Sequence, residues 1–265
     1  MPVTEYLIRN AELYPDEVAL VELNPDEKDT RRTTWKEFDL IQPSANMPYR
    51  REITWSVFNE KANRFANMLI SRGVKKGDKV AILMYNCLEW LPIFFGVYKT
   101  GAIAVTFNFR YESDEIYYCA ELAQGVVIVF GFAFIGRIEV NAERLLRGRL
   151  LIYVGDNCPS FAESYHELVA DCSSKEPDVK ITEDDYGAIY FSSGTTGFPK
   201  AILHKHQSLT QAAIMEQKHH STGRDDTFLC IPPLYHTGAK FHWMGSLVAG
   251  SKTVLLYGTK PDQLL

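Results

Sequence analysis

Short apolar runs alternate with helix-like segments along most of the chain, and this alternation restricts the possible folds more than any other feature. Residues 79–84 are apolar after the first position, as expected for a parallel strand that is covered on both faces. Further strands are predicted at residues 102–107, 126–130, 150–154, 227–231 and 253–257. Helices are predicted at residues 86–99, 113–124, 135–146, 208–219 and 240–248. The sequence therefore predicts an α/β fold in which alternating βαβ units form mainly parallel sheets with helices on both faces.

Two of these helices begin at a polar residue. Asn86 stands at the start of the helix predicted at residues 86–99, and Ser113 stands at the start of the helix at 113–124. Both side chains can accept a hydrogen bond from an amide of the first helical turn. We therefore expect Asn86 and Ser113 to cap these helices.

A polar stretch at residues 171–185 divides the alternating pattern into two blocks. We expect an N-terminal α/β subdomain over residues 1–172, a polar linker over residues 173–185 and a second α/β segment over residues 186–265. Residues 24–51 form another irregular stretch, which we interpret as a surface insertion in the first subdomain.

Composition narrows the classes of protein that need to be considered. An apolar content of 46% and a charged content of 23% are ordinary for a soluble globular protein. The formal net charge of −5, without a basic stripe, argues against a nucleic-acid partner. The longest apolar run, residues 126–136, is too short for a transmembrane segment. The five cysteines have no paired spacing and the N-terminus shows no signal peptide, so we expect a cytoplasmic protein.

The most specific chemical motif lies at residues 192–200, directly after an apolar run. Hydroxyl groups and glycine amides can donate hydrogen bonds to phosphate oxygens, and Lys200 adds a positive charge. The spacing differs from a Walker loop, because Pro199 precedes the lysine and Ala201 follows it. A polar surface loop is the alternative, but the full pattern favours a phosphate-binding role. The candidate phosphate ligands are Ser192, Ser193, Gly194, Thr195, Thr196, Gly197 and Lys200.

This motif resembles the phosphate loop of the adenylate-forming (AMP-binding) superfamily, in particular its acyl-CoA synthetase branch. Residues 53–81, 98–102 and 232–238 are similar to other conserved regions of that family. The family usually has glycine where this chain has Ala201. The family's Tyr-Gly-x-Thr-Glu motif, its ribose-binding aspartate motif and its C-terminal catalytic lysine region are not found before Leu265. The resemblance thus implies a fold like the N-terminal subdomains of acyl-CoA synthetases, with only the first half of the large domain present.

The resemblance also implies an activity. A carboxylic acid would be activated with ATP and Mg²⁺ to an acyl-adenylate and then, in the complete enzyme, transferred to coenzyme A. The chain alone is expected to be inactive, and its truncated sheet edge is expected to favour self-association. Two alternatives stay open: an amino-acid adenylation domain of a peptide synthetase, and a non-catalytic nucleotide-binding remnant. The acyl chain of the substrate is not defined by these residues.

Residue roles follow from the same resemblance. Lys200 and His236 are the expected catalytic residues, and Ser192 stands where some relatives have a hydroxyl ligand to Mg²⁺. Tyr235, His236 and Gly238 would bind the acid, on a loop that leaves a strand because residues 232–233 are both proline. Lys240 replaces an aromatic gate found in some fatty-acid relatives. The spacing of four further histidines fits no structural zinc pattern: His204, His206, His219 and His220.

Overall fold

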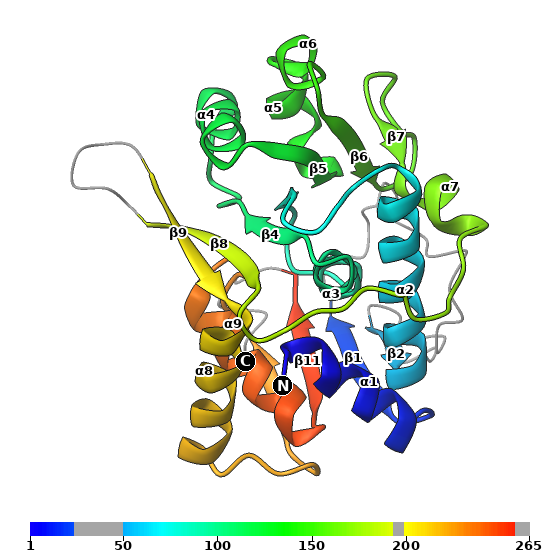
Figure 1. Ribbon diagram of the computed structural model, residues 1–265, viewed down its shortest axis with the longest axis vertical. Coiled ribbons are helices and arrows are strands. Elements are labelled where there is room, and N and C mark those ends of the chain that lie inside the picture. Colours follow the sequence, from blue (N-terminus) through cyan, green and yellow to red (C-terminus); the bar gives the residue numbers. More distant parts are fainter. Residues whose placement is uncertain (24–49, 193–198, 258–265) are drawn as a thin grey trace.

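The computed structural model describes residues 1–23, 50–192 and 199–257, which contain two β-sheets (Figure 1). The larger sheet has seven strands in the order β7-β6-β5-β3-β4-β8-β9, and the smaller has four in the order β10-β11-β1-β2. The strands of the larger sheet are β3 (Lys79–Leu83), β4 (Ile103–Thr106), β5 (Gly125–Gly131), β6 (Leu150–Val154), β7 (Glu163–Ser164), β8 (Tyr186–Ser192) and β9 (Lys200–Lys205). Those of the smaller sheet are β1 (Val18–Leu23), β2 (Arg50–Thr54), β10 (Thr227–Cys230) and β11 (Lys252–Leu256).

Most neighbouring strands are parallel, as the alternating pattern predicts. The antiparallel pairs within the described residues are β1–β2 and β8–β9. The helices are α1 (Val3–Leu13), α2 (Trp55–Ser71), α3 (Trp90–Lys99), α4 (Ser113–Ala123), α5 (Ile135–Glu139), α6 (Ala142–Leu145), α7 (Tyr165–Ala170), α8 (His206–His219) and α9 (Thr237–Ala249). None of the helices in the described part of the chain combines the length and apolar character needed to cross a bilayer.

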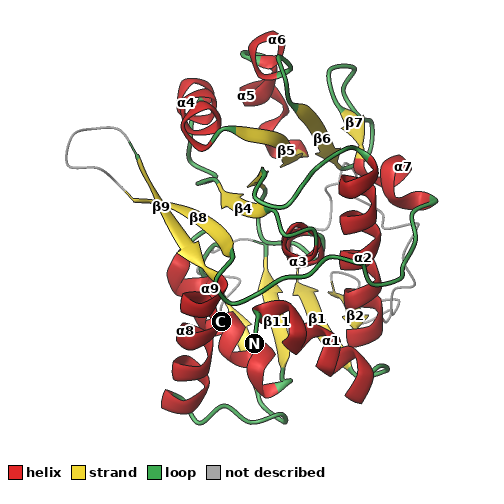
Figure 2. Ribbon diagram, viewed as in Figure 1, coloured by secondary structure: helices red, strands yellow, loops and turns green. Residues whose placement is uncertain are grey.

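Helices cover both faces of the larger sheet. Val80 and Ile82 of β3 pack with α2, α3 and α7, whereas Ala81 and Leu83 pack with α4 and α5. Helix α3 lies between the two sheets, and all of its residues are buried (Figure 2). This explains why its sequence is apolar on every side. The predicted fold class is confirmed.

Several local predictions need correction. Helix α4 is capped by Glu112, whose backbone N–H donates to the Glu115 carboxylate at 2.9 Å, so Ser113 is the first helical residue and not the cap. Helix α3 begins at Trp90 with Glu89 as its N-cap, and the Asn86 side chain binds another loop instead of capping it. The segment predicted as one helix at residues 135–146 consists of two short helices, α5 and α6, after a 3₁₀ turn.

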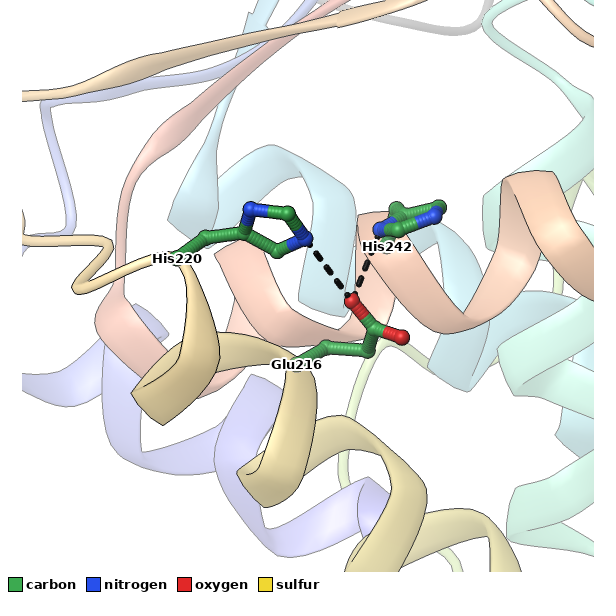
Figure 3. A group of neighbouring side chains, drawn as sticks. All are labelled: Glu216, His220 and His242. Carbon is green, nitrogen blue, oxygen red and sulfur yellow. Dashed lines mark ion pairs between the residues drawn. The ribbon is translucent and has the colours of Figure 1, made fainter.

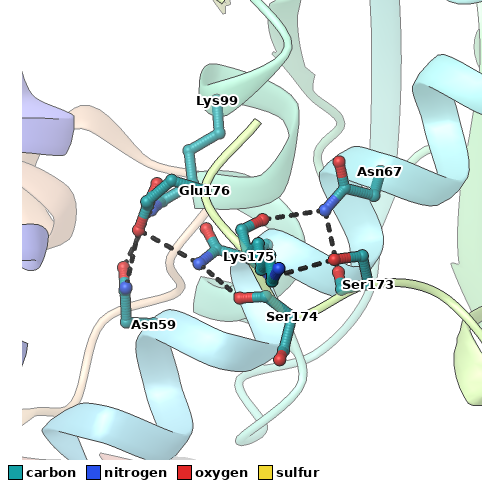
Figure 4. A network of polar contacts seen from close by, with 8 residues as sticks. Asn59, Asn67, Lys99, Ser173, Ser174, Lys175 and Glu176 are labelled. Carbon is teal, nitrogen blue, oxygen red and sulfur yellow. Dashed lines mark hydrogen bonds and ion pairs between the residues drawn. The ribbon is translucent and has the colours of Figure 1, made fainter. Parts of the chain in front are cut away.

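The polar stretch at residues 171–185 contains neither helix nor strand and follows α2 closely (Figure 4). Asn67 donates to the carbonyls of Ser173 and Lys175 at 2.8 and 2.9 Å. The Lys99 amine binds the Glu176 carboxylate at 2.6 Å. Strand β8, which follows this stretch, pairs with β4 and so extends the sheet built from the first block. The division of the chain into two subdomains stays a prediction.

Candidate functional site

The phosphate motif lies between the two strands of an antiparallel hairpin. Ser192 is the last residue of β8, Lys200 is the first residue of β9, and the two are paired across the hairpin. Sequence analysis did not predict β9, an edge strand whose residues are mostly exposed. Residues 193–198, which include the predicted ligands Ser193, Gly194, Thr195, Thr196 and Gly197, lie outside the described residues.

A cavity of about 720 Å³ opens beside this hairpin. Ser192 and Pro199, near the two ends of the phosphate motif, line this cavity together with Tyr235 and His236. Lys200 and Gly238 are not among its lining residues. The structure thus brings two separately predicted segments, residues 192–200 and 232–238, to the wall of one cavity. Its other lining residues are Thr106, Asn108, Tyr111, Glu115, Tyr190, Phe191, Ile202, His204, Thr237 and Phe241.

The loop that carries Tyr235 and His236 is held in place by two neighbouring segments. The Asn86 amide donates to the Pro232 carbonyl at 3.0 Å and accepts from the Leu234 N–H at 2.8 Å. The Thr106 hydroxyl, at the carboxyl end of β4, donates to the Tyr235 carbonyl at 3.0 Å. These bonds place the loop at the strand ends, where open parallel sheets bind ligands.

His236 is the N-cap of α9, and its ring orientation follows from that role. Its Nδ1 accepts a hydrogen bond from the Gly238 N–H at 3.1 Å. In the neutral ring the proton is therefore on Nε2, which can donate to a ligand. A Cβ added at Gly238 would lie 3.3 Å from His236 Nδ1, a tight contact, so the glycine leaves room for this arrangement.

His204 and Tyr190 form the wall of the cavity on the side of the larger sheet. Their rings meet edge to face, with centroids 5.3 Å apart. Burial lowers the pKa of His204, and the nearby positive charge of Lys240 lowers it further. Burial also raises the pKa of Tyr190. Both side chains are thus biased towards their neutral forms. Sequence analysis did not assign either residue to the site, since a histidine and a tyrosine in a strand carry no motif.

The histidines considered for zinc do not form one cluster. His206 is fully buried against Tyr98, with ring centroids 4.9 Å apart, and burial lowers its pKa to about 4. His220 instead pairs with Glu216, whose carboxylate also contacts His242, a residue not among the four considered (Figure 3).

The Glu216 carboxylate lies 3.2 Å from His220 Nε2 and 2.8 Å from His242 Nδ1. The three ligand atoms lie within 4.8 Å of one another, a spacing that could hold a metal ion. Each contact is equally well explained as an ion pair with a protonated imidazole. We therefore interpret the group as a link between α8 and α9.

The architecture is that of an α/β protein with a cavity at the ends of two of its parallel strands, β4 and β8. The chain matches the sequence model of a family described as AMP-binding enzyme over residues 7–265, and it belongs to that family. The predicted family is thus confirmed.

Relatives in this family include enzymes named as CoA ligases. The long-chain-fatty-acid–CoA ligase FadD13 of Mycobacterium tuberculosis is 30% identical over 200 residues, which cover 75% of this chain and 38% of the relative. The crotonobetaine/carnitine–CoA ligase of Citrobacter koseri is 30% identical over 214 residues, which cover 78% of this chain and 41% of the relative. The chain therefore spans well under half the length of these relatives.

Solved structures show the same fold. The inhibitor-bound N-terminal domain of FACL13 from Mycobacterium tuberculosis superposes with a TM-score of 0.78 at 24% identity, covering 99% of this chain and 59% of that chain. The anthranilate CoA ligase AuaEII, in complex with anthranoyl-AMP, gives a TM-score of 0.81 at 24% identity, covering 97% and 45%.

Proposed function

We propose that this chain is part of an AMP-forming acid–thiol ligase, which activates a carboxylic acid with ATP and transfers the acyl group to coenzyme A. Membership of the AMP-binding enzyme family and the names of its relatives support this proposal. The observation that carries it is the shared cavity, because Ser192 and Pro199, near the two ends of the phosphate motif, line the same space as His236.

The chemistry assigns a role to each part of the cavity wall. The acid's carboxylate attacks the α-phosphorus of ATP, an acyl–phosphate bond forms, and pyrophosphate leaves. Negative charge gathers on the phosphate oxygens, where preorganised donors lower the barrier. In our proposal the amides and hydroxyls of residues 193–197 hold the β- and γ-phosphates, and Lys200 supplies positive charge. His236 donates from Nε2 to the carboxylate that is being activated.

Mg²⁺, when bound, neutralises part of the phosphate charge. Ser192 is half-buried at the cavity wall and offers one hydroxyl oxygen, a ligand type that suits this hard cation. Protein sites for Mg²⁺ usually add one or two carboxylates. Glu115 lines the same cavity, but its carboxylate already accepts the Glu112 N–H. We therefore propose Ser192 as one ligand of a site that is completed by phosphate oxygens.

ATP binding tests the phosphate motif. We expect Lys200→Met to weaken the affinity for MgATP by about ten-fold or more, because a charge-assisted contact to phosphate is lost. Lys205→Met is the matched control, since Lys205 is on the same strand and its amine pairs with Asp184 at 3.1 Å. Calorimetric titration measures both affinities. Equal affinities for the two variants would contradict a phosphate role for Lys200.

Trapping of the activated acid tests the reaction. In the full-length protein, hydroxylamine should convert an acyl-adenylate formed from ATP and an acid into a hydroxamate. His236→Ala should lower this rate while leaving MgATP affinity within about two-fold, because the imidazole is assigned to the carboxylate and not to the phosphates. ATP binding without hydroxamate formation by the unmodified protein would instead favour a non-catalytic nucleotide-binding protein.

A further inference from the structure

Lys240 is a fully buried lysine in α9, one helical turn after His236. Its amine lies over three aromatic rings, at 4.2 Å from the ring centre of Phe94, 4.4 Å from that of Tyr190 and 4.7 Å from that of Trp90. Among the described residues the amine has no hydrogen-bond partner. Within the described part of the chain, this lysine therefore occupies an aromatic box without a counter-charge.

Burial of the Lys240 ammonium group destabilises the folded protein unless other interactions replace its lost hydration. A buried ammonium group normally needs an anionic partner and hydrogen-bond acceptors, and aromatic faces supply only part of the lost solvation. Burial accordingly lowers the pKa of Lys240 well below its ordinary value. The indole N–H of Trp90 is also buried and without a partner in the described part of the chain. Two unused donors thus share one apolar enclosure, which would suit an acceptor brought by a ligand.

The box adjoins the candidate site. The Tyr190 ring contacts the Lys240 amine and also lines the cavity. Phe241, the next residue along α9, lines the cavity as well. A positive charge on Lys240 would lower the pKa of His204, which also lines the cavity. A ligand that displaces the Tyr190 ring from the wall would meet the amine directly behind it.

We propose that Lys240 determines specificity by binding a second carboxylate of the substrate, at the end remote from the carboxylate that lies near His236. This inference rests on the proposed function and adds the substrate class, a dicarboxylic acid. A carboxylate fits because it brings the missing negative charge and accepts from both the amine and the Trp90 indole. The two carboxylates would be bound at residues one turn apart on the same helix, about 6 Å along its axis, which favours a short diacid.

Binding of matched acids to the full-length protein tests this assignment. Adipate should bind about ten-fold more tightly than hexanoate, and glutarate more tightly than pentanoate, in calorimetric titrations. Lys240→Met should remove the preference, because methionine is unbranched and apolar and fits an aromatic enclosure. Lys205→Met removes the same charge from an exposed site and should keep the preference.

Three results would overturn the proposal: equal binding of adipate and hexanoate, a preference that survives in Lys240→Met, or binding of 6-hydroxyhexanoate as tight as that of adipate. If Lys240→Met does not fold, lysine-labelled unmodified protein provides a second measurement. The NMR signal of the Lys240 Cε–Hε group has a chemical shift that is altered by the three neighbouring rings. This chemical shift should change on addition of adipate and should not change with hexanoate. Equal movement with both acids would also overturn the proposal.

The experiment separates this inference from the proposed function. If hydroxamate forms from ATP with hexanoate and adipate at equal kcat/KM, the ligase assignment stands and the role of Lys240 is wrong. If MgATP does not bind at all, the ligase assignment itself fails, whatever the preference among acids.

Discussion

Asn86 joins the segment before α3 to the loop that carries Tyr235 and His236. Its side chain is 5% exposed, and it makes one hydrogen bond as donor and one as acceptor to backbone groups of that loop. Removal of the amide would leave the buried Leu234 N–H without a partner. The cost of such a loss exceeds the net contribution of an ordinary hydrogen bond.

We therefore expect Asn86→Ala to lower the free energy of unfolding by about 1–3 kcal/mol. Asn67→Ala is a matched control, because Asn67 also donates to backbone carbonyls but in an exposed position. Its effect should stay below about 1 kcal/mol, since water can replace the lost bonds. Urea denaturation measures both values. A loss for Asn86→Ala no larger than that for Asn67→Ala would contradict the role of Asn86 as the anchor of this loop.

At the scale of elements, the polar stretch at residues 171–185 is attached to α2 and α3 by an asymmetric ion pair. The Lys99 side chain is 2% exposed and the Glu176 side chain 41%. Burial lowers the pKa of Lys99 although Glu176 opposes this effect. Burial alone would raise the pKa of Glu176, but the Lys99 amine and hydrogen bonds from Asn59 and Asn63 lower it below 4.5. The glutamate is thus the counter-charge for a buried amine.

This pair predicts a pH dependence of stability. The pKa of Glu176 is lower in the folded protein than in the unfolded chain, so its ionised carboxylate stabilises the fold at pH values above the ordinary carboxyl pKa. This stabilisation is lost as the pH falls through the pKa of the folded protein. Glu176→Gln should therefore reduce the free energy of unfolding at pH 7 by about 1–3 kcal/mol, because the buried Lys99 amine loses its counter-charge. The difference from the unmodified protein should shrink as the pH falls below the ordinary carboxyl pKa and should close once Glu176 is protonated in the folded protein.

Glu163→Gln is the control for this prediction. Glu163 pairs with Arg72, and both side chains are more than 40% exposed, so the expected loss is below about 1 kcal/mol. Urea denaturation over a pH series measures both variants. If the difference in free energy of unfolding between Glu176→Gln and the unmodified protein did not change with pH, the ion pair could not be its cause.

At the scale of the whole molecule, β9 leaves an outer edge of the larger sheet that no other described strand covers. Ile202 and Leu203 are 46% and 44% exposed on this strand. An open edge with apolar side chains can pair with a second molecule. We expect Leu203→Lys to shift sedimentation towards the monomer, whereas Leu122→Lys, which removes an equally exposed leucine from α4, should not. Identical association of both variants would contradict pairing through β9.

The central strands and helices could be predicted because their periodicity reflects their burial. Residues 80–84 and 126–130 are apolar because helices cover both faces of the sheet, and both segments contribute to strands as predicted. Strand β9 could not be found in this way, since an exposed edge strand buries neither face and leaves no pattern. The caps were wrong because Asn86 and Ser113 were assigned from local preference, whereas Asn86 is held by a loop that is distant in sequence.

The candidate site could be predicted only where its residues belong to motifs. Ser192, Tyr235 and His236 were identified from short patterns, and the fold brings them to one cavity. Tyr190, His204 and the aromatic box around Lys240 come from α3, α9 and the β8–β9 hairpin. Their association depends on how these elements pack, which no local pattern contains.

The smaller sheet has a consequence for how the protein is made. Strand β1, near the N-terminus, is parallel to β11, and Leu20 pairs with Thr253. A ribosome delivers residues in order, so β1 emerges long before the strand beside which it belongs. Strand β1 can pair with β2 early, but its other edge has no partner strand until almost all of this sequence has been synthesised.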